Sequence, residues 1–96
     1  MEQLNNNRWV WTIIQDPGGD EQFLGQHDEV SGISFIPFFL EKEEAEKCIS
    51  GLIKAPGHKY EIQAILFEEL KQFCTGKQVM LFLLNGTGKI LEKIEP

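Results

Sequence analysis

Three segments of the chain are apolar at both their odd and their even positions. They are residues 9–14 (WVWTII), 33–40 (ISFIPFFL) and 79–84 (VMLFLL). Because side chains along a β-strand alternate between its two faces, a strand of this kind needs cover on both faces. We therefore expect a layered structure in which helices or other segments pack on a sheet.

Two other segments have the period of a helix. Residues 41–54 predict a helix, because apolar residues recur three and four positions apart along them. These residues are Ala45, Cys48, Ile49, Leu52 and Ile53. Residues 67–74 predict a second, shorter helix that ends before Gly76.

The elements together predict an α+β domain of the order β-β-α-β-α-β-β. Strands are expected at residues 8–15, 33–40, 60–66, 79–84 and 89–95, in a single mixed sheet of about five strands with two helices. Residues 1–96 would form one α/β sandwich domain, and the polar residues 1–7 a disordered tail. Residues 16–31 are long for a loop, so they are expected to be functional or to hide a short element.

Charge and composition argue against several classes of partner. Nine basic and fifteen acidic residues give a net charge of −6, which disfavours nucleic acid and anionic membranes. The N-terminus lacks the pattern of a signal peptide, and no apolar run approaches the length of a membrane span. Cys48 and Cys74 are too few for a disulfide framework. We expect a cytoplasmic protein.

A glycine-rich stretch, NGTGK at residues 85–89, invites comparison with a phosphate-binding loop. That loop requires an earlier glycine where this chain has Leu83, and a hydroxyl residue where it has Ile90. Asn85-Gly86 between two apolar runs is instead typical of a β-hairpin. The hairpin loop would hold two or four residues, and four would pair Leu83 with Ile90.

No constellation of catalytic or metal-binding residues emerges from the sequence. His27 lies among four acidic residues, Asp20, Glu21, Asp28 and Glu29. His27 and one or two of these carboxylates could bind a metal ion, but a solvated acidic loop is the preferred interpretation. Both cysteines fall on apolar helix faces, where a thiol is buried and inert. We predict no catalytic residue, no cofactor and no metal, and hence no enzyme.

Two stretches resemble the N-terminal domain of SseB-like proteins. The first is residues 36–46, IPFFLEKEEAE, where a strand that ends in proline and phenylalanine leads into an acidic helix start. The second is residues 79–86, VMLFLLNG, although that family commonly has Asn-Pro where this chain has Asn85-Gly86. The resemblance implies an α/β sandwich and assigns no functional residue.

The apolar strands suggest a function through association. Two helices would cover one face of a single sheet, so the other face would be covered by residues 16–31, by strong curvature that closes the sheet on itself, or by a partner. The predicted interface residues are Trp9, Trp11, Phe35 and Phe39, since aromatic residues are enriched at binding hot spots. The leading hypothesis is a non-enzymatic domain that forms a homodimer or binds another protein. The alternative is a small-molecule or metal-binding regulatory module that uses residues 16–31.

Overall fold

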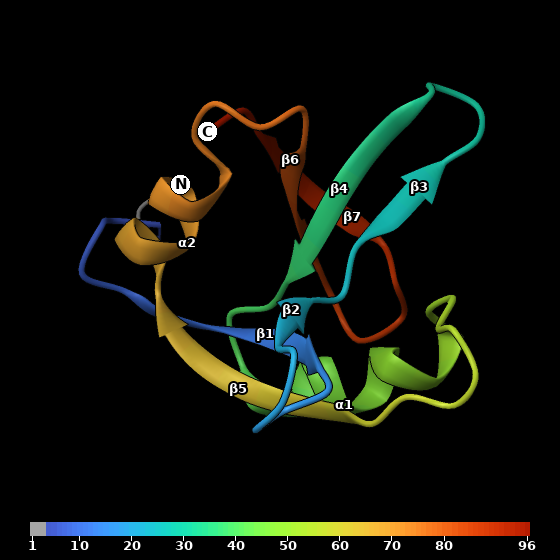
Figure 1. Ribbon diagram of the computed structural model, residues 1–96. Helices are drawn as coiled ribbons and strands as arrows, with labels where there is room; N and C mark the ends of the chain where they lie inside the picture. The colour runs from blue at the N-terminus through green and yellow to red at the C-terminus, as the bar shows by residue number, and fades with distance from the viewer. Residues whose placement is uncertain (1–3) are drawn as a thin grey trace.

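The strands form two sheets rather than one (Figure 1). The computed structural model describes residues 4–96. The first sheet has the order β2-β1-β5, with β1 at Trp9–Gln15, β2 at Gln22–Phe23 and β5 at Tyr60–Leu66. The second has the order β3-β4-β6-β7, with β3 at Gln26–Asp28, β4 at Ile33–Phe38, β6 at Met80–Leu84 and β7 at Ile90–Ile94. The α+β class is confirmed, and the single five-stranded sheet is wrong.

Two short connections join the sheets. Phe39, just beyond β4, exchanges backbone hydrogen bonds of 2.8 and 2.9 Å with Trp11 of β1. The N–H of Leu24, between β2 and β3, donates to the Ile13 carbonyl at 2.8 Å. The chain therefore passes from one sheet to the other within residues 22–28 and again near Phe39. The predicted loop at 16–31 contains the two short strands β2 and β3.

Strand pairing is mixed. β5 is antiparallel to β1 along its whole length, from Trp9 opposite Leu66 to Gln15 opposite Tyr60. β4 and β6 are parallel neighbours, and β6 and β7 form an antiparallel hairpin. β6 is thus a central strand, as its apolar sequence predicts.

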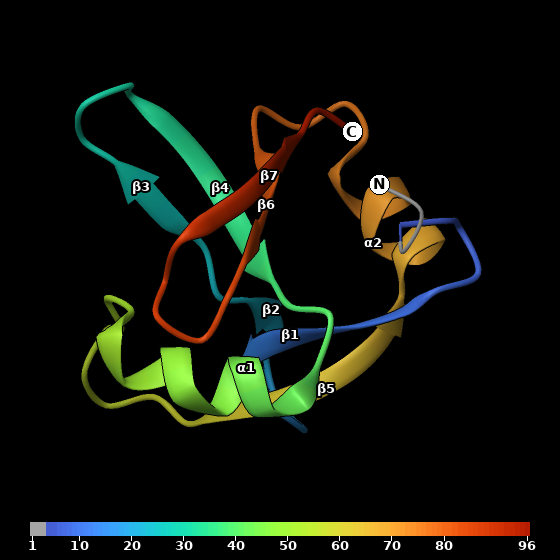
Figure 2. The ribbon, with the colours of Figure 1, turned by 180° about the vertical axis from the view of Figure 1, so that it is seen from behind.

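The helices are α1 (Lys42–Cys48), the 3-10 helix η1 (Ile49–Gly51) and α2 (Phe67–Cys74). α1 and α2 lie apart from each other in both ribbon views (Figures 1 and 2). α2 packs in one core with Val10, Ile36, Phe38, Leu81 and Leu83. α1 packs in a second core with Ile13, Leu24, Phe39, Phe82 and Leu84.

The two cores explain why three strands are apolar on both faces. Val10 and Ile13 of β1 belong to different cores, and so do Leu83 and Leu84 of β6. Each helix covers a different face of these strands, together with residues of the other sheet. The expectation that both helices share one face is therefore wrong, and most of the apolar surface that it left over is buried inside the domain.

The first helix is shorter than the predicted range 41–54. α1 ends at Cys48, a 3-10 turn follows, and Leu52 has an extended backbone. Gly51 disfavours helix, and Ile53 is 79% exposed, so burial does not compensate for it. Only the first part of the predicted apolar stripe is therefore fully buried, at Ala45 and Cys48.

Residues 85–89 form the predicted hairpin turn. The Asn85 side-chain oxygen accepts hydrogen bonds from the N–H groups of Thr87 and Lys89, each at 3.0 Å, and Gly88 has a φ of 85°. The turn holds one residue more than the longer predicted alternative. Ile90 consequently pairs with Leu84 rather than with Leu83.

The segment 1–7 was expected to be a disordered tail. Residues 1–3 lie outside the described part of the chain. Leu4 packs against the α2 core, and the Asn6 carbonyl accepts a hydrogen bond from the Glu68 N–H at 3.2 Å. Residues 4–7 are thus attached to the domain, because Leu4 gives them an apolar contact. Among residues 4–96, no helix combines the length and hydropathy of a membrane span.

Candidate functional site

The four predicted interface residues fall into two separate pairs. Trp9 and Trp11 lie on β1 and are at least partly exposed, with Trp9 58% exposed. Phe39 is 0% exposed and belongs to the α1 core, so it is not available to a partner in this conformation. Phe35 is half-buried and stacks on Phe82, with ring centroids 4.1 Å apart. The structure does not bring the four together on one open face.

The two tryptophans share a sheet face with the end of β5. Trp9 lies opposite Leu66 and Trp11 opposite Ala64 in the antiparallel ladder. Residues directly opposite each other in such a ladder project to the same face. We call Trp9, Trp11, Ala64 and Leu66 the tryptophan face. Trp9 and Ala64 are exposed, and Trp11 and Leu66 are partly buried.

The tryptophan face is open because α1 covers only the other half of the same sheet face. Ile62 and Tyr60, in the first part of β5, pack in the α1 core. Figure 2 shows α1 in front of the first part of β5, while the end of β5 that leads into α2 stays clear of it. The Lys42 ammonium, at the start of α1, lies 5.7 Å from the Trp11 ring centroid. It lies at the boundary between the part of the sheet face that α1 covers and the tryptophan face.

One edge of β5 has no strand beside it among residues 4–96. Trp11 and Ile13 direct their backbone groups away from β5, to Phe39 and Leu24. Because successive residues of a strand direct these groups to alternate edges, the even-numbered residues of β1 bond to β5. Their partners on β5 are Glu61, Gln63 and Ile65. The residues between them, Tyr60, Ile62, Ala64 and Leu66, direct their N–H groups to the outer edge, where no described strand pairs with them.

The outer edge of β5 differs from the other three sheet edges. β2 has two residues and β3 has three, and such short strands are poor templates for pairing. β7 has five residues, contains Lys93, and pairs with a register shift at Leu83/Leu84. β5 has seven residues in regular register and contains neither proline nor lysine. It is therefore the edge that is least protected against a further strand.

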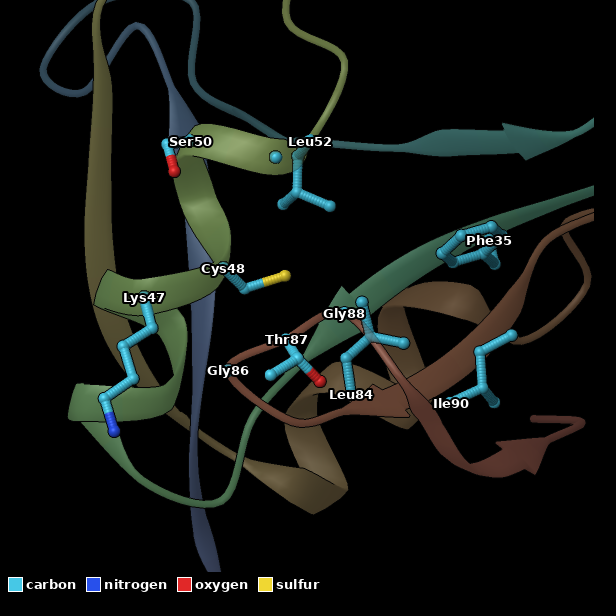
Figure 3. Close-up of a pocket in the computed structure, with 11 residues that line it drawn as sticks. Phe35, Lys47, Cys48, Ser50, Leu52, Leu84, Gly86, Thr87, Gly88 and Ile90 are labelled. Atoms are coloured by element: carbon cyan, nitrogen blue, oxygen red, sulfur yellow. The ribbon is translucent and has the colours of Figure 1, made fainter.

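Phe35 lines a groove on another part of the molecule (Figure 3). The groove has a volume of about 400 Å³ and lies between η1 and the 85–89 turn. Leu84 and Ile90 line it together with Phe35, and the Cys48 side chain points toward the space between helix and turn (Figure 3). Burial raises the pKa of the Cys48 thiol, which keeps it protonated and unreactive at neutral pH.

The environment of Cys74, in the core that contains α2, is similar to that of Cys48. It is buried and free, and burial raises the pKa of its thiol. The predicted burial of both cysteines is thus confirmed.

Glu21 and Asp28 accept hydrogen bonds from groups within the segment 16–31. Asp28 accepts hydrogen bonds from the Ser31 hydroxyl at 2.8 Å and from the Val30 N–H, and these lower the pKa of its carboxyl. His27 contacts the Ser34 hydroxyl at 3.2 Å. Within residues 4–96, no three histidine, cysteine or acidic side chains converge as a metal site would require.

The second histidine, His58, lies at one end of the β1–β5 ladder, next to the pair Gln15 and Tyr60. The His58 ring is 2.7 Å from the Asp16 carboxylate, and this hydrogen bond lowers the pKa of Asp16. Both side chains are partly exposed.

Sequence reasoning proposed the tryptophans as candidates and did not point to the edge of β5. The alternating segment YEIQAIL predicts a strand at residues 60–66, and the structure confirms it. Whether a strand lies at an edge depends on partners that are distant in sequence, so its own residues do not show it. The regular length and the lack of proline and lysine are the signals that mark it once the topology is known.

Comparisons of the chain with protein-family models, curated proteins and solved structures gave no match. The resemblance to SseB-like proteins stays a prediction.

Proposed function

We propose that this protein is a non-enzymatic domain that functions by binding protein through the tryptophan face and the outer edge of β5. The single observation that supports it most is the juxtaposition of the two features. A seven-residue edge strand offers backbone groups for pairing, and Trp9 and Ala64 are exposed beside it. Strand addition takes affinity from such backbone groups and specificity from the adjoining side chains.

The chemistry of the described residues supports a binding role over catalysis. The two thiols are buried, His27 lies exposed beside the Ser34 hydroxyl, and His58 forms a hydrogen bond with the Asp16 carboxylate. A general acid or base is expected in a cleft beside the group with which it exchanges a proton. Free thiols with no disulfide between them also fit a cytoplasmic location, which we include in the proposal.

The experiment compares two variants that each remove one exposed apolar side chain. Trp9→Ala alters the tryptophan face, whereas Val30→Ala alters a residue that is 98% exposed in the β3–β4 turn. Molar mass is measured by light scattering over about a hundredfold range of concentration. Each variant is also immobilised to capture binding proteins, and both must unfold at the wild-type temperature.

We expect association to weaken in Trp9→Ala and to stay unchanged in Val30→Ala. The proposal fails if the wild-type protein stays monomeric and captures nothing that Trp9→Ala loses. It also fails if both variants lose binding equally, because the contact would then not involve the tryptophan face.

A further inference from the structure

We propose that the partner at the β5 edge is a second copy of this chain, paired antiparallel through β5 about a two-fold axis at Gln63. This inference rests on the proposed function and names its partner. Two identical edge strands pair with closed symmetry when they run antiparallel, because each contact then occurs twice. The two three-stranded sheets would join into one.

The direction of the backbone groups determines which registers are possible. Outward-facing residues of one copy must oppose outward-facing residues of the other. With Gln63 opposite Gln63, Ile62 opposes Ala64 of the second copy and exchanges both N–H···O bonds with it. Tyr60 opposes Leu66, whose N–H also faces outward. This register engages every outward-facing residue of β5.

The side chains agree with that register. On the tryptophan face, Ile62 would meet Ala64 and Tyr60 would meet Leu66, so apolar side chains meet apolar ones. On the opposite face, Glu61 would lie opposite Ile65, and no two carboxylates would be directly opposed. Gln63 would face its own copy, and two amides can donate to and accept from each other.

The charges at the two ends of β5 are complementary. Lys59 precedes the strand, and Glu68 and Glu69 lie in the first turn of α2 directly after it. Antiparallel pairing brings Lys59 of one copy beside Glu68 and Glu69 of the other, and Glu61, the carboxylate at the Lys59 end, lies opposite Ile65. A parallel arrangement would bring like charges together, which disfavours it.

The uncovered half of each sheet also complements the covered half of the other. α1 packs over Tyr60 and Ile62, whereas the face at Ala64 and Leu66 is open. Antiparallel pairing places Tyr60 and Ile62 of the second copy, with its α1, alongside the open half. Trp9 and Trp11 would thus gain cover from an element that is already part of the chain.

The test is a cross-link specific to this register. Directly opposed residues in a pair that exchanges no hydrogen bonds have Cα atoms about 4.5 Å apart, within the range of a disulfide. Gln63 would occupy that position, so Gln63→Cys should form a disulfide-linked dimer under mild oxidation. Glu61→Cys is the matched control, because its two copies would lie about 13 Å apart. Cys48 and Cys74 are buried, so the wild-type protein controls for background.

A second variant removes pairing without disturbing the fold. Ala64 is exposed and its N–H faces outward, so Ala64→Pro breaks no hydrogen bond within the domain. We expect Ala64→Pro to weaken dimerisation by about tenfold or more and to unfold near the wild-type temperature.

The outcomes separate this inference from the proposed function. Cross-linking of Gln63→Cys but not of Glu61→Cys, with loss of the dimer in Ala64→Pro, supports the inference. If both cysteine variants cross-link alike, or if neither does, the register is overturned. If wild-type protein stays monomeric but binds another protein through Trp9, the second copy is excluded while the proposed function stands.

Discussion

The tryptophan face and the aromatic seam are built from neighbouring strands and have opposite environments. We use the term aromatic seam for Phe35, Phe39 and Phe82, which lie where the second sheet meets α1. Trp11 and Phe39 are joined by two backbone hydrogen bonds, so the regions are in contact. Yet Phe39 is fully buried, while Trp9, two residues before Trp11, is largely exposed.

The difference results from the position of α1. The helix begins three residues after Phe39 and packs back over the seam and the first part of β5. Its direction leaves the other half of the β1–β5 face without a covering helix or strand from the described part of the chain (Figure 2). Aromatic residues near one another in space thus differ in role according to which ones a short helix reaches.

The largest expected effect on stability comes from a substitution in the aromatic seam. Phe39→Ala would remove a fully buried ring and leave a cavity between α1 and the sheets, so unfolding free energy should fall by about 3–5 kcal/mol. Trp9→Ala is the comparison, and its effect on stability should be much smaller. Urea denaturation measures both. Equal losses for the two variants would contradict the distinction between seam and face.

The second effect concerns association. If Trp9 is a hot spot, Trp9→Ala should weaken self-association by about 2 kcal/mol, or roughly thirtyfold in Kd. A conservative replacement, Trp9→Phe, keeps an aromatic ring and should lose less. Sedimentation equilibrium of the three proteins gives the values. A Kd unchanged in Trp9→Ala would remove the tryptophan from the contact.

Local patterns in the sequence were sufficient to predict the main strands and both helices but not how they assemble. Residues 60–66 and 79–84 have patterns that determine a strand without reference to anything distant. The division into two sheets depends on the pairing of β1 with β5 and of β4 with β6, which are distant in sequence, and no local pattern encodes these pairings. β2 and β3 are too short to produce a detectable period.

The same reason explains why the four predicted interface residues separate in the structure. Trp9 and Phe39 are both aromatic, and both lie in segments of the sequence that are apolar at odd and even positions. Only the path of α1 separates them, and that path depends on how Ala45 and Cys48 pack in the second core. Sequence reasoning could therefore propose the aromatic residues as a group and not divide them.

A third, smaller effect lies within the seam. Phe35 and Phe82 stack at 4.1 Å with an interplanar angle of 14°. Leucine replacements, singly and together, should show a coupling energy of about 0.5–1.5 kcal/mol in chemical denaturation. Purely additive losses would mean that the rings contribute by burial alone. Phe23 and Phe73, at 4.7 Å in an edge arrangement, provide a reference pair in the other half of the domain.

The smallest expected effect on stability concerns Asp16, which lies at the far end of the β1–β5 ladder from Trp9. The hydrogen bond from His58 holds the pKa of Asp16 below its ordinary value of 3.8, so the folded state favours the ionised carboxylate. Its contribution to stability is therefore present above pH 3.8 and is lost as the pH falls through the lower pKa of the folded state. Asp16→Asn should be less stable than wild type near neutral pH.

That deficit should disappear in acid, and thermal melts between neutral pH and pH 3 test it. Asn tolerates the positive φ of 56° at this position, so backbone strain does not obscure the comparison. A deficit that stays constant with pH would show that the Asp16 charge is not responsible. Association through the tryptophan face should not change in this variant.

The most direct test of association through the β5 edge is amide hydrogen exchange followed residue by residue at low and high protein concentration. Glu61, Gln63 and Ile65 bond to β1 and should be protected at both concentrations. Ile62 and Ala64 face outward, and we predict that they exchange rapidly in dilute protein and become protected as the concentration rises. Rapid exchange of these two amides in a sample whose measured mass is that of a dimer would contradict it.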